Sequence, residues 1–120
     1  MMKYLVMDMT DTQIFDTEKE ARKCLADWLE DTRESTKETL ALGYPREIEH
    51  WKREEDFYAG KDNIDYEIRL YAIDTDVYDG ELTKAWDGCE GVERIETVST
   101  TVEALGLEWP TVEEDMTLDE

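Results

Sequence analysis

Basic residues are scarce in this chain of 120 residues. Its 13 lysines and arginines stand against 33 aspartates and glutamates, which gives a formal net charge of −20. Proteins that bind nucleic acid directly use lysine and arginine to neutralise phosphates, and the same residues attract proteins to anionic membrane surfaces. The deficit therefore argues against nucleic acid and membranes as direct partners. It predicts a basic protein as the partner instead.

Long apolar runs are also missing. None approaches the roughly 20 residues that a membrane helix needs, and the four apolar residues between Lys3 and Asp8 are too few for the core of a signal peptide. The two cysteines, Cys24 and Cys89, lie far apart and have no cysteine or histidine neighbour at metal-ligand spacing. We expect a reducing, cytoplasmic location without disulfides, which is the host cytoplasm if a phage encodes the protein.

The remaining composition is that of a folded domain. Hydrophobic residues make up 40% of the chain and aromatic residues 10%, enough to build a core. A chain of this length forms one domain in the usual case. We expect this domain to span residues 1–110. Residues 111–120 contain five acids, no base and few apolar anchors, so we expect a frayed tail there.

The clearest local pattern predicts a long helix. Thr17 and Glu20 have the spacing of a capping box at a helix start. Behind them, apolar residues recur at the spacing of one helical face, at Ala21, Cys24, Leu25, Trp28 and Leu29. We predict a helix over residues 17–31 that continues more weakly to residue 42, before Gly43 and Pro45. Cys24 is expected to be a small core residue of this helix.

Strand patterns surround this helix. They occur at residues 3–9, 13–15, 64–73 and 92–98. Pro45 is expected to open a second helix, and residues 81–86 a short one. Tyr71 and Ile73 lie on the outer face of the predicted 64–73 strand, which indicates that a helix covers part of that face. The order predicts an α+β fold, with a small antiparallel or mixed sheet and the long helix packed on one face.

The negative charge is concentrated late in the chain. From Asp74 onward there are fifteen acids, and Lys84 and Arg94 are the only bases. Spread evenly, the net charge amounts to roughly one per 340 Å² of folded surface, whereas duplex DNA carries about one per 100 Å². Gathered on roughly a third of the surface, the same charges would match DNA. The asymmetry therefore suggests that carboxylates take the place of phosphates.

In size and acidity the chain resembles the small phage-type DNA-mimic inhibitors, which comprise antirestriction proteins, anti-CRISPR proteins and inhibitors of uracil-DNA glycosylase. The resemblance is one of composition and covers about the last 47 residues. It rests on residues 74–81, on Glu90, Glu93 and Glu96, and on residues 113–115. It implies that the protein occupies a nucleic-acid groove on a nuclease or another defence effector, without catalysis.

We therefore expect a non-enzymatic inhibitor that binds and blocks a basic nucleic-acid-binding protein. Carboxylates bind the arginines and lysines that normally hold phosphates, through charge-assisted hydrogen bonds. The candidate partner-binding residues are Asp74, Asp76, Tyr78, Asp79, Glu81, Asp87, Glu90, Glu93 and Glu96, with Tyr78 as an aromatic anchor. Two alternatives stay open. One is an immunity protein or antitoxin that neutralises a specific basic toxin, and the other is an acidic soluble domain without a charge-based partner.

Catalytic and metal-binding patterns are weak. Asp8 to Thr12 resembles the phosphorylation loop of haloacid-dehalogenase-type phosphotransferases, but the chain is too short for that fold. Residues 74–80 fail the spacing of a calcium-binding EF-hand loop. His50, the single histidine, lacks a serine or cysteine nucleophile in a recognisable context. We expect no enzymatic activity, no cofactor and no resident metal.

Overall fold

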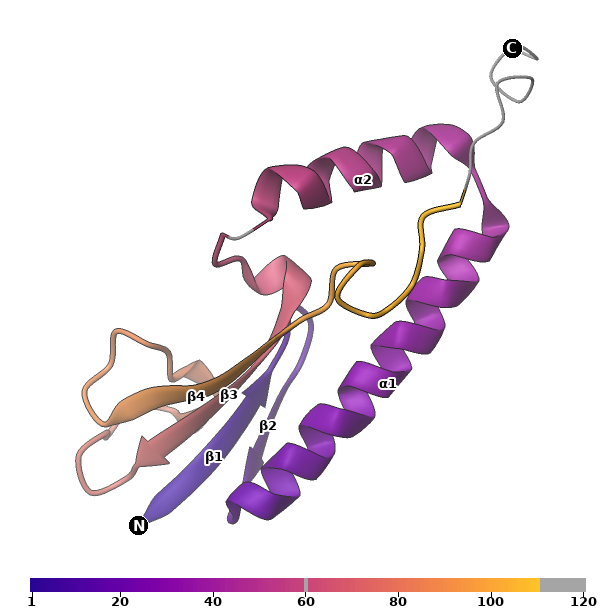
Figure 1. The fold of residues 1–120 in the computed structure, drawn as a ribbon. Helices are drawn as coiled ribbons and strands as arrows, with labels where there is room; N and C mark the ends of the chain where they lie inside the picture. Colours follow the sequence, from indigo (N-terminus) through magenta and orange to yellow (C-terminus); the bar gives the residue numbers. More distant parts are fainter. Residues whose placement is uncertain (60, 111–120) are drawn as a thin grey trace.

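A computed structural model describes residues 1–59 and 61–110 of the chain. Four strands form one antiparallel sheet in the order β2-β1-β3-β4. The strands are β1 (Met2–Met7), β2 (Thr12–Phe15), β3 (Glu67–Asp74) and β4 (Val92–Ser99), and the helices are α1 (Glu18–Leu42) and α2 (Pro45–Tyr58). Two short 3₁₀ turns, η1 (Ile64–Tyr66) and η2 (Leu82–Lys84), complete the fold. The predicted α+β architecture with a helix-covered antiparallel sheet is confirmed (Figure 1).

Helix α1 begins and ends where the sequence indicates. The Thr17 hydroxyl accepts a hydrogen bond from the Glu20 backbone N–H at 3.2 Å, as an N-cap should. The helix then runs for 25 residues, including the weaker stretch to Leu42, and ends at Gly43. Gly43 adopts a φ of 65°, in the left-handed region that glycine tolerates without strain. The whole predicted span is therefore one continuous helix.

One face of the sheet packs against α1. Buried residues of the strands and the helix meet there, and they are Val6, Ala21, Cys24, Leu25, Ile68 and Leu70. Cys24 is therefore a core residue and a free thiol, as predicted. Figure 1 shows α1 crossing this face and extending well beyond the ends of the strands. We call this side of the sheet the helix face.

The opposite face of the sheet is covered by an extended segment. Leu5, Tyr71 and Ile73 are fully buried there together with Ala85 of the 75–91 connection between β3 and β4. We call residues 75–91 the acidic loop and this side of the sheet the loop face. The prediction that a helix covers Tyr71 and Ile73 was therefore wrong, since the cover is a loop with only one 3₁₀ turn, η2. Residues 64–66 also differ, because they form η1 rather than the start of the strand.

Further buried apolar residues lie beyond the sheet. Helix α2 folds back from the end of α1, and residues 100–110 run between the two helices (Figure 1). Leu40, Ile48, Val102 and Leu105 are buried in this part of the molecule. The Arg33 Nε atom also donates a hydrogen bond to the Leu105 carbonyl at 3.1 Å, which ties α1 to the C-terminal segment.

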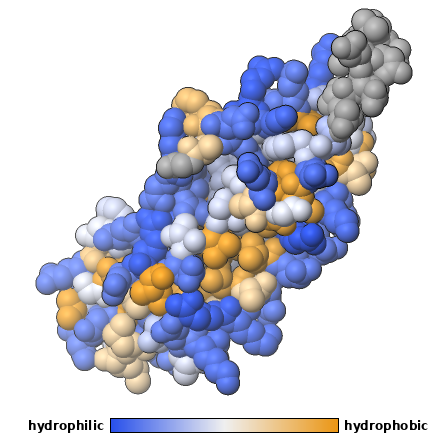
Figure 2. Space-filling view, in the orientation of Figure 1, coloured by the Kyte–Doolittle hydropathy of each residue, from blue (hydrophilic) through white to orange (hydrophobic). Residues whose placement is uncertain are grey.

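The surface view agrees with this arrangement. Figure 2 shows apolar side chains gathered along the seam between α1 and the adjoining sheet and C-terminal segment, with hydrophilic residues on both sides. Among the residues that the structure describes, no helix is both long enough and apolar enough to span a membrane. The predicted frayed tail at residues 111–120 lies outside the described residues.

Glu55 is a buried acid that joins α2 to the C-terminal segment. Its side chain is 6% exposed, and its two carboxylate oxygens accept hydrogen bonds from the Val102 N–H at 2.9 Å and the Trp51 indole N–H at 2.8 Å. Burial raises the pKa of the Glu55 carboxyl, and these two hydrogen bonds partly oppose the rise. A carboxyl group is needed here because both of its oxygens accept.

Replacing Glu55 by glutamine should destabilise the protein, because the amide NH₂ cannot accept one of these two hydrogen bonds. We expect Glu55→Gln to lose about 1–3 kcal/mol of unfolding free energy at pH 4. The loss should be smaller at pH 7, since the raised pKa means that ionisation of Glu55 costs the wild type stability as the pH rises. Urea denaturation at both pH values measures this difference.

The neighbouring Glu54→Gln variant is the matched control, because Glu54 is exposed and lies 3.6 Å from the exposed His50 on the surface of α2. It should change stability by less than about 0.5 kcal/mol. Equal effects of the two substitutions would contradict the assigned role of Glu55.

Candidate interaction surface

The acidic loop is anchored by its own apolar residues. Tyr78 and Leu82 pack against the buried cluster on the loop face of the sheet. The Tyr78 hydroxyl donates a hydrogen bond to the Glu81 carbonyl at 2.6 Å, and it lies so close to Gly80 that a Cβ atom there would come within 2.6 Å of the hydroxyl oxygen. Tyr78 therefore has a structural role in the loop, and its role as an anchor for a partner stays a prediction.

Arg94 of β4 holds the loop from the opposite side. Its two terminal nitrogens donate to the two carboxylate oxygens of Asp62 at 2.8 and 2.7 Å, a bidentate pair. The same guanidinium pairs with Asp87 of the acidic loop, and it donates to the Thr97 hydroxyl at 3.1 Å. The Arg94 side chain is only 18% exposed. One arginine therefore joins the acidic loop, β4 and the turn before η1.

Arg69 extends this network along the loop face. It donates to the Glu67 carboxylate and to the Tyr71 hydroxyl, both at 3.2 Å, and reaches Asp62 at 3.5 Å. Glu67 is 7% exposed and also lies 3.7 Å from Arg94. The carboxylates of Asp62, Glu67 and Asp87 therefore lie close together, and each is paired with Arg69, with Arg94 or with both. The buried charge of Glu67 is not left unpaired.

The electrostatic effect of Arg94 appears in the carboxyl pKa values. Its hydrogen bonds lower the pKa of Asp62 to about 2 and also lower the pKa of Asp87. The same bonds raise the pKa of the Arg94 guanidinium. All three groups are therefore charged at neutral pH, and the pairs are part of the folded structure.

The predicted partner-binding residues do not all behave alike. Asp87 and Glu96 already form ion pairs, with Arg94 and with Arg22 of α1 respectively. Glu96 faces α1 because a β-bulge leaves Ile95 without a partner on β3 and turns both side chains to the helix face. These two carboxylates are less available to a partner than the sequence suggested.

The other predicted acids lie in the acidic loop and at the ends of the two strands that flank it. Asp74 and Gly91 are joined by a backbone hydrogen bond of 2.8 Å, so the ends of the acidic loop meet there. Asp74 accepts from the Asp76 N–H within its own turn, whereas the exposed Asp76 and Glu81 have only surface pairs, with the Met1 amine and Lys84. In the described part of the chain, three of the predicted acids are exposed and form no ion pair, namely Asp79, Glu90 and Glu93.

Trp86 is the exposed aromatic residue of the acidic loop, and sequence reasoning missed it. Its side chain is 59% exposed, although it lies next to the buried Ala85. The ring lies above Gly88, where a Cβ atom would come within 2.4 Å of it. A tryptophan between a small apolar residue and Asp87, in a loop rich in acids, was the available signal. Trp86 and Val77, 48% exposed, are the apolar residues that this loop presents to solvent.

The residues of the weak catalytic and metal-binding patterns form no catalytic or metal-binding group within the described residues. The Asp8 carboxylate accepts hydrogen bonds from the N–H groups of Thr10 and Asp11, both at 2.8 Å, and so closes the turn between β1 and β2. Within residues 1–59 and 61–110, no group of three or more histidine, cysteine, aspartate or glutamate side chains has the geometry to hold a metal ion. His50 lies on the exposed side of α2, 3.6 Å from Glu54.

Comparisons with protein families, with curated proteins and with solved structures give no match for this chain. The interpretation of the surface therefore depends on its own residues.

Replacing Arg94 should loosen the acidic loop and change its response to acid. We expect Arg94→Gln to lose roughly 2 kcal/mol of unfolding free energy at pH 7, because Asp62 and Asp87 lose their charged donor. The pKa of Asp62 should rise from about 2 toward its ordinary value of 3.8, which NMR titration of the carboxyl carbons measures.

The sign of the pH dependence follows from the lowered pKa. Ionised Asp62 stabilises the wild type above about pH 4, and that stabilisation is lost as the pH falls toward 2. The variant should therefore lose less stability over this range. Arg53→Gln, which removes an exposed pair with Glu49, is the control and should leave the Asp62 titration unchanged. An unshifted Asp62 titration in Arg94→Gln would contradict the assignment.

Proposed function

We propose that this protein is an inhibitor that binds a basic nucleic-acid-binding protein, such as a nuclease or another defence effector, and blocks its nucleic-acid site. The observation that carries the proposal is a rigidly held acidic segment. Residues 74–93 contain seven acids and a single base, Lys84, and they are fixed to the sheet by Arg94 and by the cluster around Tyr71 and Ala85.

Rigid attachment matters because binding costs entropy. A flexible acidic loop would have to be ordered when it binds, and that cost would reduce its affinity. In this chain the loop is already folded. Its Asp79 and Glu90, and Glu93 at the start of β4, are exposed and form no ion pair among the described residues. These carboxylates are free to accept the bidentate hydrogen bonds that arginine otherwise donates to phosphates.

The overall charge and shape support the same proposal. A net charge of −20 attracts a basic partner over long distances and raises the association rate at low salt. The molecule is elongated, with extents of 61 × 24 × 19 Å. The two shorter dimensions of its backbone are of the same order as the roughly 20 Å width of a DNA duplex.

Exposed Trp86 favours a second candidate, an immunity protein or antitoxin that neutralises one basic toxin. Tryptophan is enriched at the energetic centres of protein–protein interfaces, where it fills a pocket on the partner. The two functions differ in whether the blocked surface is a nucleic-acid site. Competition by DNA therefore separates them.

Neutralising three exposed acids should abolish partner capture. We expect immobilised wild-type protein to capture nucleic-acid-binding proteins from a bacterial lysate at low salt, and both added duplex DNA and higher salt to release them. The triple variant Asp79→Asn, Glu90→Gln, Glu93→Gln should lose this capture, because it removes the carboxylates proposed to replace phosphates. Quantitative mass spectrometry of the eluates measures the change.

The matched control changes the net charge equally on α1, through Glu30→Gln, Asp31→Asn and Glu38→Gln, three exposed acids of that helix. It should retain capture. The proposal fails if both triple variants behave alike or if DNA releases nothing. Specific capture that salt weakens but DNA does not would favour the immunity protein or antitoxin.

Trp86 should contribute to affinity without contributing to stability. We expect Trp86→Ala to weaken binding to the captured partner about tenfold or more, as central interface tryptophans do. The melting temperature should change little, since most of the side chain faces solvent. Tyr44→Ala is the control, because Tyr44 is equally exposed but lies at the junction of α1 and α2. Titration calorimetry with the purified partner distinguishes the two, and equal affinities would contradict a role for Trp86.

A further inference from the structure

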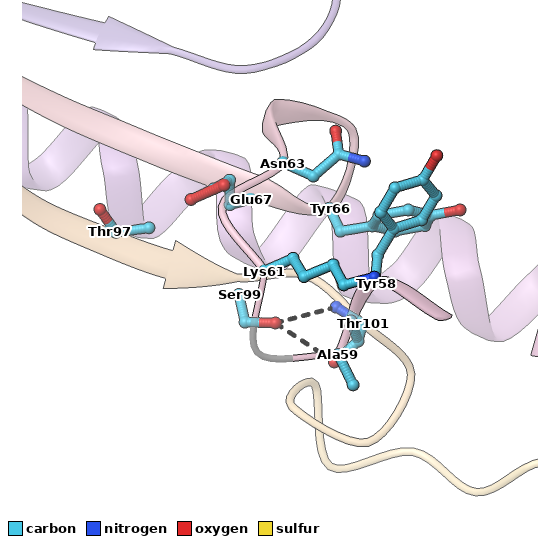
Figure 3. Close-up of a pocket in the computed structure, with 9 residues that line it drawn as sticks. All are labelled: Tyr58, Ala59, Lys61, Asn63, Tyr66, Glu67, Thr97, Ser99 and Thr101. Atoms are coloured by element: carbon cyan, nitrogen blue, oxygen red, sulfur yellow. Dashed lines mark hydrogen bonds between the residues drawn. The ribbon is translucent and has the colours of Figure 1, made fainter. Parts of the chain in front are cut away.

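A pocket lies at the end of the sheet away from the ends of the acidic loop. It has a volume of about 330 Å³ and is formed where the end of α2 meets the start of β3 and the end of β4. It is lined by Tyr58, Asn63, Tyr66, Thr97 and Ser99 and by the buried Glu67 (Figure 3). Its volume is at the lower end of the range for ligand pockets, which suits one side chain better than a large cofactor.

The pocket combines an aromatic wall with hydrogen-bond acceptors. The rings of Tyr58 and Tyr66 have centroids 5.7 Å apart and are inclined by 35°, so they pack against each other and together form the aromatic wall of the pocket. The hydroxyls of Thr97 and Ser99 come from alternate residues of β4 and lie on the same side of the strand. Each hydroxyl oxygen already accepts one hydrogen bond, Thr97 from Arg94 at 3.1 Å and Ser99 from the Thr101 N–H at 3.4 Å. A hydroxyl oxygen has two lone pairs, so a flat ligand rich in donors can bond to the second one.

The surroundings of the aromatic wall are negative. The pKa of the Tyr66 hydroxyl is raised, first by burial and then by the carboxylates of Glu54, Glu55 and Asp65. Such a field favours a cation against the tyrosine faces. The chain already contains one such contact nearby, since the Lys61 ammonium lies 3.8 Å from the centroid of the Phe57 ring.

An anionic ligand has less support here. The two arginines on this face, Arg69 and Arg94, are each paired with carboxylates, which leaves Lys61 as the one cation lining the pocket. Replacing Lys61 by a neutral residue should therefore have opposite effects on the binding of an anionic and of a cationic ligand. An anion loses its attraction, whereas a cation loses a competing positive charge.

We propose that this pocket receives an arginine side chain of the basic partner, with the guanidinium against the packed pair of Tyr58 and Tyr66. The proposal rests on the proposed function, because it names the chemistry by which the same partner is held at a second place. The guanidinium is planar, stacks on aromatic rings and carries five donors that suit the hydroxyls and amide of the pocket. Together, the acidic loop and the pocket place two contacts at opposite ends of the sheet.

The test uses N-acetyl-arginine amide as a probe and follows its binding by NMR chemical shifts of the wild-type protein. We expect saturable shifts at Asn63, Tyr66 and Ser99, with a dissociation constant in the millimolar range for a ligand of this size. The citrulline analogue has the same shape without the charge, and it should bind at least about fivefold more weakly.

Three variants make the test specific. Tyr58→Leu should weaken binding of the probe about fivefold. The control is Tyr44→Leu, which should leave binding unchanged, because Tyr44 is exposed and does not line the pocket. Lys61→Gln should strengthen binding about twofold to threefold, because a like charge is removed. Absence of saturable shifts up to roughly 50 mM probe, equal binding of citrulline, or weaker binding in Lys61→Gln would each overturn the proposal.

The probe experiment needs no partner, so its outcome is separate from that of the lysate capture. The triple variant Asp79→Asn, Glu90→Gln, Glu93→Gln should bind the probe as the wild type does. Probe binding without partner capture would support the pocket and contradict the proposed function. Partner capture without probe binding would support the proposed function and contradict the role of the pocket.

Discussion

The fold of the acidic loop depends on the ion pairs of Arg94. A chain with 33 acids and 13 bases opposes its own compaction through charge repulsion. Arg94 is placed where it compensates this repulsion at two points, since it bonds Asp62 before η1 and Asp87 in the loop while it stays in β4. Few cations are available late in the chain. The position of Arg94 therefore determines which acids form ion pairs within the fold and which stay exposed without one among the described residues.

Local sequence patterns predicted helix α1 and the central strand β3. They did not predict that the acidic loop covers the loop face of the sheet. The capping box at Thr17 and the helical spacing from Ala21 onward fixed α1, because both signals act within a few residues. The pairing of Asp62 with Arg94 joins residues 32 positions apart and leaves no periodic trace in the sequence. Burial of Tyr71 was predicted, but the element that buries it depends on such long-range contacts.

The candidate surface was predicted in part for the same reason. Composition located the acid-rich region, but it could not separate carboxylates that hold the fold from those left free. In the sequence, nothing distinguishes Glu96 from the other acids. In the structure, the bulge at Ile95 places its side chain next to Arg22. The contacts of Tyr78 with Glu81 and Gly80, and the exposure of Trp86, also depend on how the loop folds and were not visible in the composition. The proposals therefore rest on those side chains that the fold leaves unused.

The central claim is that the acidic loop is a fixed part of the fold before any partner binds. Amide hydrogen exchange of the wild-type protein tests it directly, because the N–H groups of Tyr78, Ala85 and Cys89 donate backbone hydrogen bonds within the loop. The account predicts that these amides exchange far more slowly than in an unfolded chain, within the range of the strand amides. Exchange at the rate of an unstructured peptide, while β3 remains protected, would contradict it.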